Sequence, residues 1–330
     1  MTAPQVDPAL AEMMDAVFAE HGRDGDLWSR LDGLGLVRLT GAEESGGSGA
    51  GWHEAAELLS AAVRHGVRMP LAENDLLASW VLDAAGIGYD AALRTVCLLD
   101  ERGNADAVPW ASHADRIVVV WPRGGGYLAA DVVADSVTIA PGVNMIGEPR
   151  DDVTADVGAL RGIDIGTELV AQLALKSALT RAIQVCAALD RALELSIEHT
   201  TSREQFGRPL AKFQAVQHLI SDIAAEAALA RSATEAALAA AVASDWSSPQ
   251  LEFLVAAARS CAGHAASVVV RNAHQVHGAI GTTSEHRLHE YTRAALAWRS
   301  EFGSVRHWDA RLTDMAMQAG PHRLWELICP

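Results

Sequence analysis

Apolar positions recur with a helical period at both ends of the chain and follow a strand-like pattern in the middle. Asp7 and Pro8 precede an amphipathic stretch, and two further periodic stretches follow, which predicts short helices over residues 1–94. The segments TVCLL, RIVVVW, YLAADVV and SVTIA are short, rich in β-branched residues and separated by turns. These segments predict a small β domain at 95–160.

The last part of the chain, 161–330, returns to a helical period over longer stretches. Its predicted helices cover residues 167–199, 212–243, 248–275 and 285–298. Because short loops join them, we expect an antiparallel four-helix bundle. The expected fold is therefore α+β and mostly α, with an N-terminal helical domain, a truncated small β domain and a C-terminal helical bundle.

Charge and cysteine content narrow the class of partner and the compartment. The formal net charge is −16, and so acidic a surface disfavours nucleic-acid and membrane partners. No apolar run approaches the roughly 20 residues that span a bilayer, and the first residues form no basic-then-apolar leader. The cysteines lack a Cys-x-x-Cys pair and are expected to be buried thiols in a reducing compartment: Cys97, Cys186, Cys261 and Cys329. We therefore expect a cytoplasmic protein.

Two sequence features invite a ligand but favour a structural interpretation. The loop GGSGAG (46–51) lacks the G-x-G-x-x-G spacing and follows helical sequence, so it is interpreted as a helix connection. His274 and His277, and likewise His286 and His289, are spaced i,i+3. No Glu-x-x-His or cysteine partner stands at ligand spacing nearby, so we expect ordinary polar contacts and no metal.

The segment HTTSREQFGRPLAKFQAVQH (199–218) is the most specific in the chain. Gly207 and Pro209 predict the end of a long helix, with Phe206 packed at the corner. Arg203 has two interpretations. It forms a surface ion pair with a neighbouring glutamate, or its guanidinium binds a diphosphate.

The second notable segment is AHQVHGAIGTTSEHRLHEYTR (273–293). Gly278 and Gly281 let the backbone bend after a long helix and expose its N–H groups, which is suited to an anion. Ser284 is the expected N-cap of the next helix. An ordinary glycine turn is the alternative.

Together, R-x-x-F-G-x-P-L-x-x-F-Q and the later Q-x-x-G-x-x-G-x-T-x-E resemble the C-terminal pattern of acyl-CoA dehydrogenases. The resemblance covers nearly the whole chain and is strongest from about 165 to 295. In that family FAD lies between two subunits: one binds the isoalloxazine and supplies a base, and its neighbour holds the diphosphate and adenosine. By resemblance, the FAD contacts are Arg203, Phe206, Gln214, Gln275, Val276, Gly278 and Ala279, the last in place of the family's usual second glycine.

The chain departs from the family where the flavin ring and the catalytic base belong. It has no TEPGAGSD-type loop and no W-I-T-N-type segment. The family's base is a glutamate just before Gly-Thr, and that position holds Phe302, before Gly303. Glu301 is one residue early, which on a helix turns a side chain by about 100°. We therefore expect Glu301 to be a solvated glutamate near Arg299 rather than a base.

Some relatives place the base on the long helix instead. Ser177 holds that position here, with Lys176 beside it, so neither alternative supplies a carboxylate.

The resemblance implies a subunit of an FAD-dependent acyl-CoA dehydrogenase, which desaturates an acyl-CoA thioester between its α and β carbons. With its own active site degenerate, the chain would need a longer acyl-CoA dehydrogenase subunit in an α2β2-type heterotetramer. Such relatives act on bulky CoA thioesters, including those of steroid side chains, and pass electrons to an acceptor. Two alternatives stay open: a homo-oligomeric dehydrogenase that uses Glu301, and a flavin-free helical scaffold. The scaffold is disfavoured because four residues are retained together: Arg203, Phe206, Gln214 and Gln275.

Overall fold

The structure is a computed structural model that describes residues 6–328. The chain forms two compact units, which meet in sequence between Ser177 and Ala178. That junction falls inside one long helix, so the division differs from the three segments expected from sequence.

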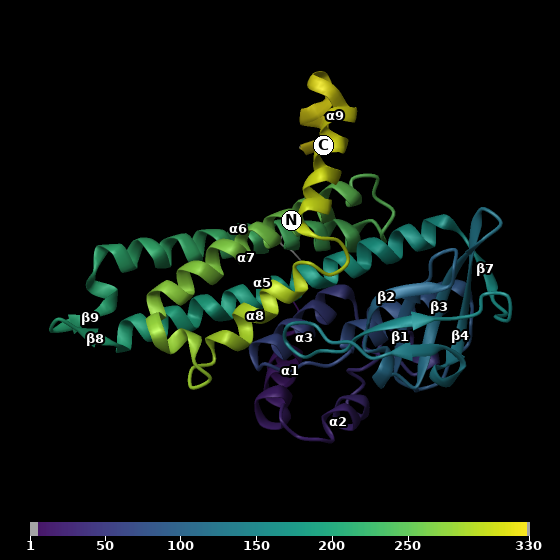
Figure 1. Cartoon of the computed structure of the whole chain (residues 1–330), viewed down its shortest axis with the longest axis horizontal. Coiled ribbons are helices and arrows are strands. Elements are labelled where there is room, and N and C mark those ends of the chain that lie inside the picture. The colour runs from purple at the N-terminus through teal and green to yellow at the C-terminus, as the bar shows by residue number, and fades with distance from the viewer. Residues whose placement is uncertain (1–5, 329–330) are drawn as a thin grey trace. The chain divides into compact units, whose positions relative to one another are not determined.

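Helices form the first part of the N-terminal unit (Figure 1). They are α1 (Pro8–His21), α2 (Leu27–Gly33), α3 (Trp52–Arg64), a π-helix η2 (Ala72–Ser79) and α4 (Trp80–Ala85). A carboxylate oxygen of Asp7 accepts the backbone N–H of Ala9 over 2.8 Å, so the predicted start of α1 is confirmed. The predicted glycine-rich connection before α3 is also present, and the last predicted helix of this part is found as η2 and α4. Its π-helical geometry and α2 were not predicted.

The π-helix places three consecutive polar side chains in the protein interior. Glu73, Asn74 and Asp75 are each less than 5% exposed. The Asn74 side chain donates to the Val37 carbonyl over 2.8 Å, and Asp75 accepts both the amide and the hydroxyl of Thr40. Burial raises the pKa of Asp75 to about 7. The widened helix thus turns polar groups towards neighbouring backbone rather than towards solvent.

Seven strands form two small sheets in the same unit. They are β1 (Arg94–Leu98), β2 (Asn104–Pro109), β3 (Arg116–Arg123), β4 (Gly126–Val133), β5 (Thr138–Ala140), β6 (Arg150–Thr154) and β7 (Ile163–Ile165). The strand orders are β1-β3-β4-β7 and β2-β6-β5. The β1–β3 pair is parallel and the other pairs are antiparallel. The four predicted segments became β1, β3, β4 and β5, while β2, β6 and β7 were missed.

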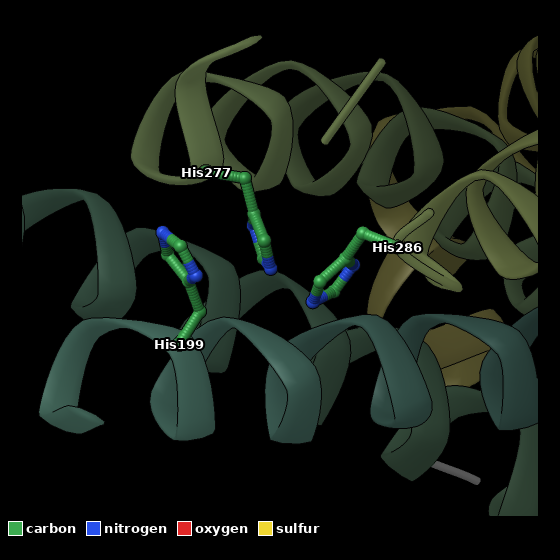
Figure 2. Close-up of side chains that lie close together, drawn as sticks. All are labelled: His199, His277 and His286. Carbon is green, nitrogen blue, oxygen red and sulfur yellow. The ribbon is translucent and has the colours of Figure 1, made fainter. Parts of the chain in front are cut away.

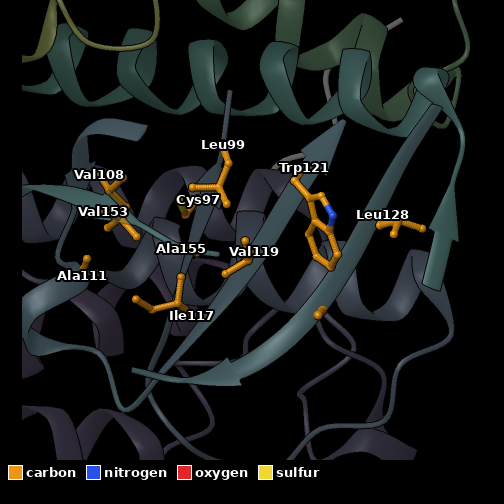
Figure 3. Close-up of a cluster of buried hydrophobic side chains, with 11 residues drawn as sticks. Cys97, Leu99, Val108, Ala111, Ile117, Val119, Trp121, Leu128, Val153 and Ala155 are labelled. Carbon is orange, nitrogen blue, oxygen red and sulfur yellow. The ribbon is translucent and has the colours of Figure 1, made fainter. Parts of the chain in front are cut away.

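One apolar cluster joins the two sheets (Figure 3). Trp121 and Val119 of β3, Cys97 of β1 and Val153 of β6 are all nearly or fully buried within it. Each contributes to stability by removing apolar surface from water, roughly 25 cal/mol for each Å² buried. This core holds together a β region whose second sheet contains several polar residues.

The long helices of the C-terminal part are packed along small side chains. They are α5 (Thr167–Ser202), α6 (Gln214–Ala243), α7 (Leu251–His277), α8 (Leu288–Trp298) and α9 (Val305–Ile328). α6 and α7 lie side by side (Figure 1). A Cβ added to Gly263 of α7 would lie 2.5 Å from a Val305 methyl of α9, so these helices touch at a glycine. The predicted bundle is confirmed, and α9 was not predicted.

Helix α7 is more apolar than the sequence expectation allowed. With the turn that follows it, Leu251–Thr282, it is long and apolar enough by composition to cross a membrane, but half of its apolar window is buried inside the protein. Arg259 interrupts the apolar sequence of this helix. Half-burial is typical of a core helix in a bundle.

The cysteines differ in exposure. Cys97 and Cys186 are buried free thiols, and burial raises the pKa of each to about 12, so both stay protonated and unreactive. Cys261 is partly exposed, contrary to the expectation of burial, and Cys329 lies outside the described residues.

Candidate functional site

A pocket of about 800 Å³ lies at one end of the helical bundle, and predicted cofactor contacts form much of its wall. The end of α5, the start of α6 and the end of α7 all contribute to it. Five of the seven predicted contact residues line it: Arg203, Gln275, Val276, Gly278 and Ala279. Phe206 and Gln214 are not among the lining residues. The structure therefore brings together two motifs that are some 70 residues apart in sequence.

A β-hairpin with a two-residue turn forms the rim of this pocket, where the sequence predicted the end of a helix. α5 ends at Ser202, and the short strands β8 (Glu204–Gln205) and β9 (Arg208–Pro209) pair beyond it. Phe206 and Gly207 form the turn with φ of 53° and 78°, as a type I′ hairpin requires. Phe206 is 90% exposed at the tip. The expectations that Gly207 ends the helix and that Phe206 packs at a corner are wrong, because strand pairing begins directly after Ser202.

Arg203 is exposed and reaches the pocket without an ion pair of its own. Glu198 lies 3.4 Å from Arg191 instead. Across residues 6–328 the structure gives the Arg203 guanidinium no carboxylate partner within 4.0 Å. The surface ion pair, one of the two interpretations offered above, is therefore not formed, and the guanidinium is available to an anionic ligand.

The end of α7 supplies the opposite wall through an unusual glycine. Gly278 has φ 63° and ψ −142°, a conformation that is essentially restricted to glycine. Its N–H donates to the His274 carbonyl, so the predicted exposed amide is not free at this position. A 3-10 turn follows over Gly278–Thr282, and α8 begins at Leu288 with Arg287 at its N-cap. Ser284 as N-cap is therefore wrong.

Glu301 is held by a buried arginine rather than exposed to solvent. Nε of Arg181 donates to Oε2 of Glu301 over 2.7 Å, and the glutamate side chain is 15% exposed. Arg299, its expected neighbour, donates to the Ser267 hydroxyl instead. The expectation of a solvated glutamate is wrong, since the chain beyond α8 turns back against α5.

A second buried arginine fixes the backbone around Glu301. Arg259 of α7 donates to the carbonyls of Glu301 and Gly303 over 2.7 and 3.1 Å. Burial, together with the positive charge of Arg181, lowers the pKa of Arg259 to about 10. The Arg181 guanidinium also lies 5.0 Å from the centre of the Phe302 ring. The segment where relatives carry a base is thus clamped by two arginines that the sequence analysis missed.

The alternative base position on the long helix also lacks a carboxylate. The Ser177 hydroxyl donates to the Leu173 carbonyl over 2.8 Å within the helix. Beside it, Lys176 is 2% exposed, and its Nζ lies 4.9 Å and 4.5 Å from the ring centres of Trp52 and Trp80. Two aromatic faces therefore stabilise this buried ammonium group.

Comparison with known proteins finds a matching family model and similar sequences. The family model described as the acyl-CoA dehydrogenase C-terminal domain matches residues 165–305, which include both motifs. Over this segment the chain is similar to the acyl-CoA dehydrogenases. Acyl-CoA dehydrogenase IpdE2 of Mycobacterium tuberculosis is 27% identical to it over 89% of this chain and 92% of that protein. Acyl-CoA dehydrogenase FadE34 of the same organism is 28% identical over 98% of this chain, which spans only 47% of FadE34.

Solved structures share the fold at lower identity. A chain of the ChsE4–ChsE5 complex from Mycobacterium tuberculosis superposes with a TM-score of 0.82 at 23% identity, covering 95% of this chain and 97% of that one. A chain of the Tcur3481–Tcur3483 steroid ACAD gives 0.83 at 22% identity, covering 94% and 97%. The α+β, mostly helical fold expected from sequence is confirmed.

Proposed function

We propose that this chain is a subunit of an FAD-dependent acyl-CoA dehydrogenase and that it holds the diphosphate and adenosine of a shared FAD without supplying the catalytic base. The observation that carries the proposal is that Arg203 and the Gln275–Gly278 turn line one pocket. In addition, Arg181 donates a hydrogen bond to Glu301.

The pocket residues fit the anionic and polar parts of FAD. Arg203 offers an exposed guanidinium with no carboxylate partner among the described residues, and a guanidinium can bind a diphosphate bidentately. Gln275 is exposed at the same wall, where its amide can donate to or accept from a ribose or adenine group. Space is open beside Gly278, with no atom within 4 Å of an added Cβ, so a ligand can approach the backbone closely.

FAD supplies the hydride acceptor when it is bound, and the reaction also needs a carboxylate to remove the proton α to the thioester. Such a base must reach within about 3 Å of that proton. Glu301 is hydrogen-bonded to Arg181, and Phe302 occupies the aligned position. This chain therefore binds and orients one part of the cofactor, and the base comes from another subunit.

The partner that supplies the base is a longer acyl-CoA dehydrogenase subunit, in an α2β2-type heterotetramer. Support comes from the ChsE4–ChsE5 complex, which has two components, and from the Tcur3481–Tcur3483 steroid ACAD. The proposed substrate class is accordingly a bulky acyl-CoA, such as a steroid side-chain thioester. A cytoplasmic site of action and an electron-transfer acceptor complete the proposal.

Co-production with a candidate longer subunit tests this proposal. Produced alone, the chain should bind little FAD and be inactive. Together, the two chains should co-purify with FAD and oxidise an acyl-CoA in the presence of an artificial electron acceptor. If the chain alone purifies as an active tetramer with one flavin per chain, the homo-oligomeric alternative replaces this proposal. If a two-chain complex forms without flavin, the scaffold alternative replaces it.

A further inference from the structure

Three histidines from separate elements meet next to the pocket (Figure 2). His199 belongs to α5, His277 is the last residue of α7, and His286 lies just before α8. One ring nitrogen from each lies within 4.8 Å of the other two. The His199 and His277 rings stack with centroids 4.5 Å apart, and His286 approaches His277 at 4.6 Å. This trio differs from both histidine pairs that are spaced i,i+3 in the sequence, because each pair contributes only one of its members.

His277 is oriented like a metal-ligating histidine. Its Nδ1 lies 2.7 Å from the Ala273 carbonyl, a contact that requires the proton on Nδ1 and leaves a lone pair on Nε2. That Nε2 is buried without a hydrogen-bond partner, in a side chain that is 5% exposed. Metal-bound histidines characteristically donate their second nitrogen to a carbonyl or carboxylate in this way. A buried acceptor left unpaired destabilises the fold, and a bound metal ion would remove that penalty.

The three imidazoles are also held in the form that binds metals. Burial lowers the pKa of His277 to about 4. It lowers the pKa of His199 and His286 as well, and the neighbouring His286 adds to the effect on His199. Neutral rings keep a lone pair free at physiological pH.

We propose that His199, His277 and His286 bind a transition-metal ion of the Zn²⁺ class, with a water molecule as fourth ligand. Zn–N bonds of about 2.0–2.1 Å place tetrahedral ligand nitrogens about 3.4 Å apart. The nitrogens observed lie within 4.8 Å of one another, so binding requires the rings to rotate until their in-plane lone pairs converge on the ion. Imidazole nitrogen is a preferred ligand of Zn²⁺, Co²⁺ and Ni²⁺.

Binding would rearrange one existing hydrogen bond. The Leu288 amide donates to Nδ1 of His286 over 3.1 Å, which leaves the proton of the neutral ring on Nε2. Ligation exchanges this neutral hydrogen bond for the metal bond. His286 precedes α8 and belongs to no helix or strand, so its ring can turn without disrupting one. The metal would then link α5, α7 and the segment before α8.

Metal binding is tested on the full chain after removal of any affinity tag. Co²⁺ and Zn²⁺ are titrated into chelator-treated protein. Binding of Co²⁺ is followed by its visible d–d absorption, and binding of Zn²⁺ by calorimetry and thermal unfolding. We expect one ion per chain, a Co²⁺ spectrum without thiolate charge-transfer bands, and a rise in unfolding temperature with metal concentration. His277→Asn and His199→Asn should each weaken binding at least tenfold, whereas the exposed His264→Asn should not.

Three results would overturn the site. These are no stoichiometric binding by the wild-type chain, equal binding by His277→Asn and His199→Asn, and a thiolate spectrum that reports cysteine ligands. Circular dichroism of each variant separates lost binding from lost folding, and His286→Asn provides a third ligand variant if either of the first two is unfolded. The test needs no flavin and no substrate, so its failure leaves the proposed function intact.

Discussion

Arg181 and Glu301 form a hydrogen-bonded ion pair across 120 residues of sequence. The arginine is 1% exposed and the glutamate 15%, so the carboxylate is the counter-charge of a buried guanidinium. Removing one partner of such a pair leaves the other charge buried and uncompensated. Glu301 therefore has a structural role that competes with any role as a base.

We predict that Glu301→Gln will change stability more than turnover. Glutamine keeps the size and an acceptor oxygen but removes the charge that faces Arg181, at a cost of roughly 1–3 kcal/mol. Turnover of the two-chain complex should stay within a few-fold. A general base contributes roughly 10²–10⁴-fold to rate, so its loss would be obvious in a steady-state assay.

Glu285→Gln is the matched control for this variant, because Glu285 is exposed. It should alter neither stability nor turnover. A hundredfold fall in turnover for Glu301→Gln, with FAD bound and the fold intact, would instead identify Glu301 as the base.

Arg203→Ala should weaken FAD retention in the two-chain complex by about 2–4 kcal/mol, because the variant lacks the proposed charged contact to the diphosphate. Gln275→Ala should cost only about 1 kcal/mol, as expected for a neutral hydrogen bond. Flavin absorbance after dilution or gel filtration measures both effects.

Arg231→Ala provides the comparison for charge alone. Arg231 lies on α6 and pairs with Asp190, away from the residues that line the pocket. The Arg231→Ala variant should retain flavin as the wild type does. If Arg203→Ala retains flavin equally well, Arg203 does not contact the cofactor.

Local sequence was sufficient for much of the fold and for both motifs. The long helices follow from apolar periodicity, and the predicted α6 and α7 are within three residues of their observed bounds. Strands β2 and β6 were missed because their sequences, NADAVP and RDDVT, each contain a single valine among small and polar residues. Asp151 of β6 is fully buried and accepts the backbone amides of Ser112 and Gly142. Loop contacts of that kind leave no periodic signal.

The parts of the site that sequence did not predict depend on contacts between distant segments. Arg181 and Arg259 stand on apolar helix faces, where a buried arginine is expected only if a partner is known. His199, His277 and His286 come from three segments, and spacing rules compare neighbours along the chain. A single sequence does not show which distant positions lie close together in the fold.

Gly278→Ala should destabilise the turn between α7 and α8. No atom lies within 4 Å of an added Cβ, so the cost, about 1–3 kcal/mol, arises from the backbone conformation alone. Gly88→Ala is the control, because its Cβ also meets open space and its φ is not positive; it should be nearly neutral. Thermal unfolding of both variants measures the difference, and equal midpoints would contradict this backbone requirement.

Asp75→Asn should remove a pH dependence of stability from the N-terminal unit. Burial raises the pKa of Asp75 from 3.8 to about 7, so the folded state holds a proton that the unfolded state has already released. The resulting stability is present below the unfolded pKa and is lost as pH rises to about 7. Asparagine keeps an acceptor for the Thr40 amide and hydroxyl but cannot ionise. Between about pH 5.5 and about pH 8 the wild type should therefore lose roughly 2 kcal/mol relative to Asp75→Asn. Urea unfolding at both pH values measures this difference, with the exposed Asp135→Asn as control. A difference between wild type and Asp75→Asn that does not change with pH would mean that Asp75 stays ionised in the folded protein.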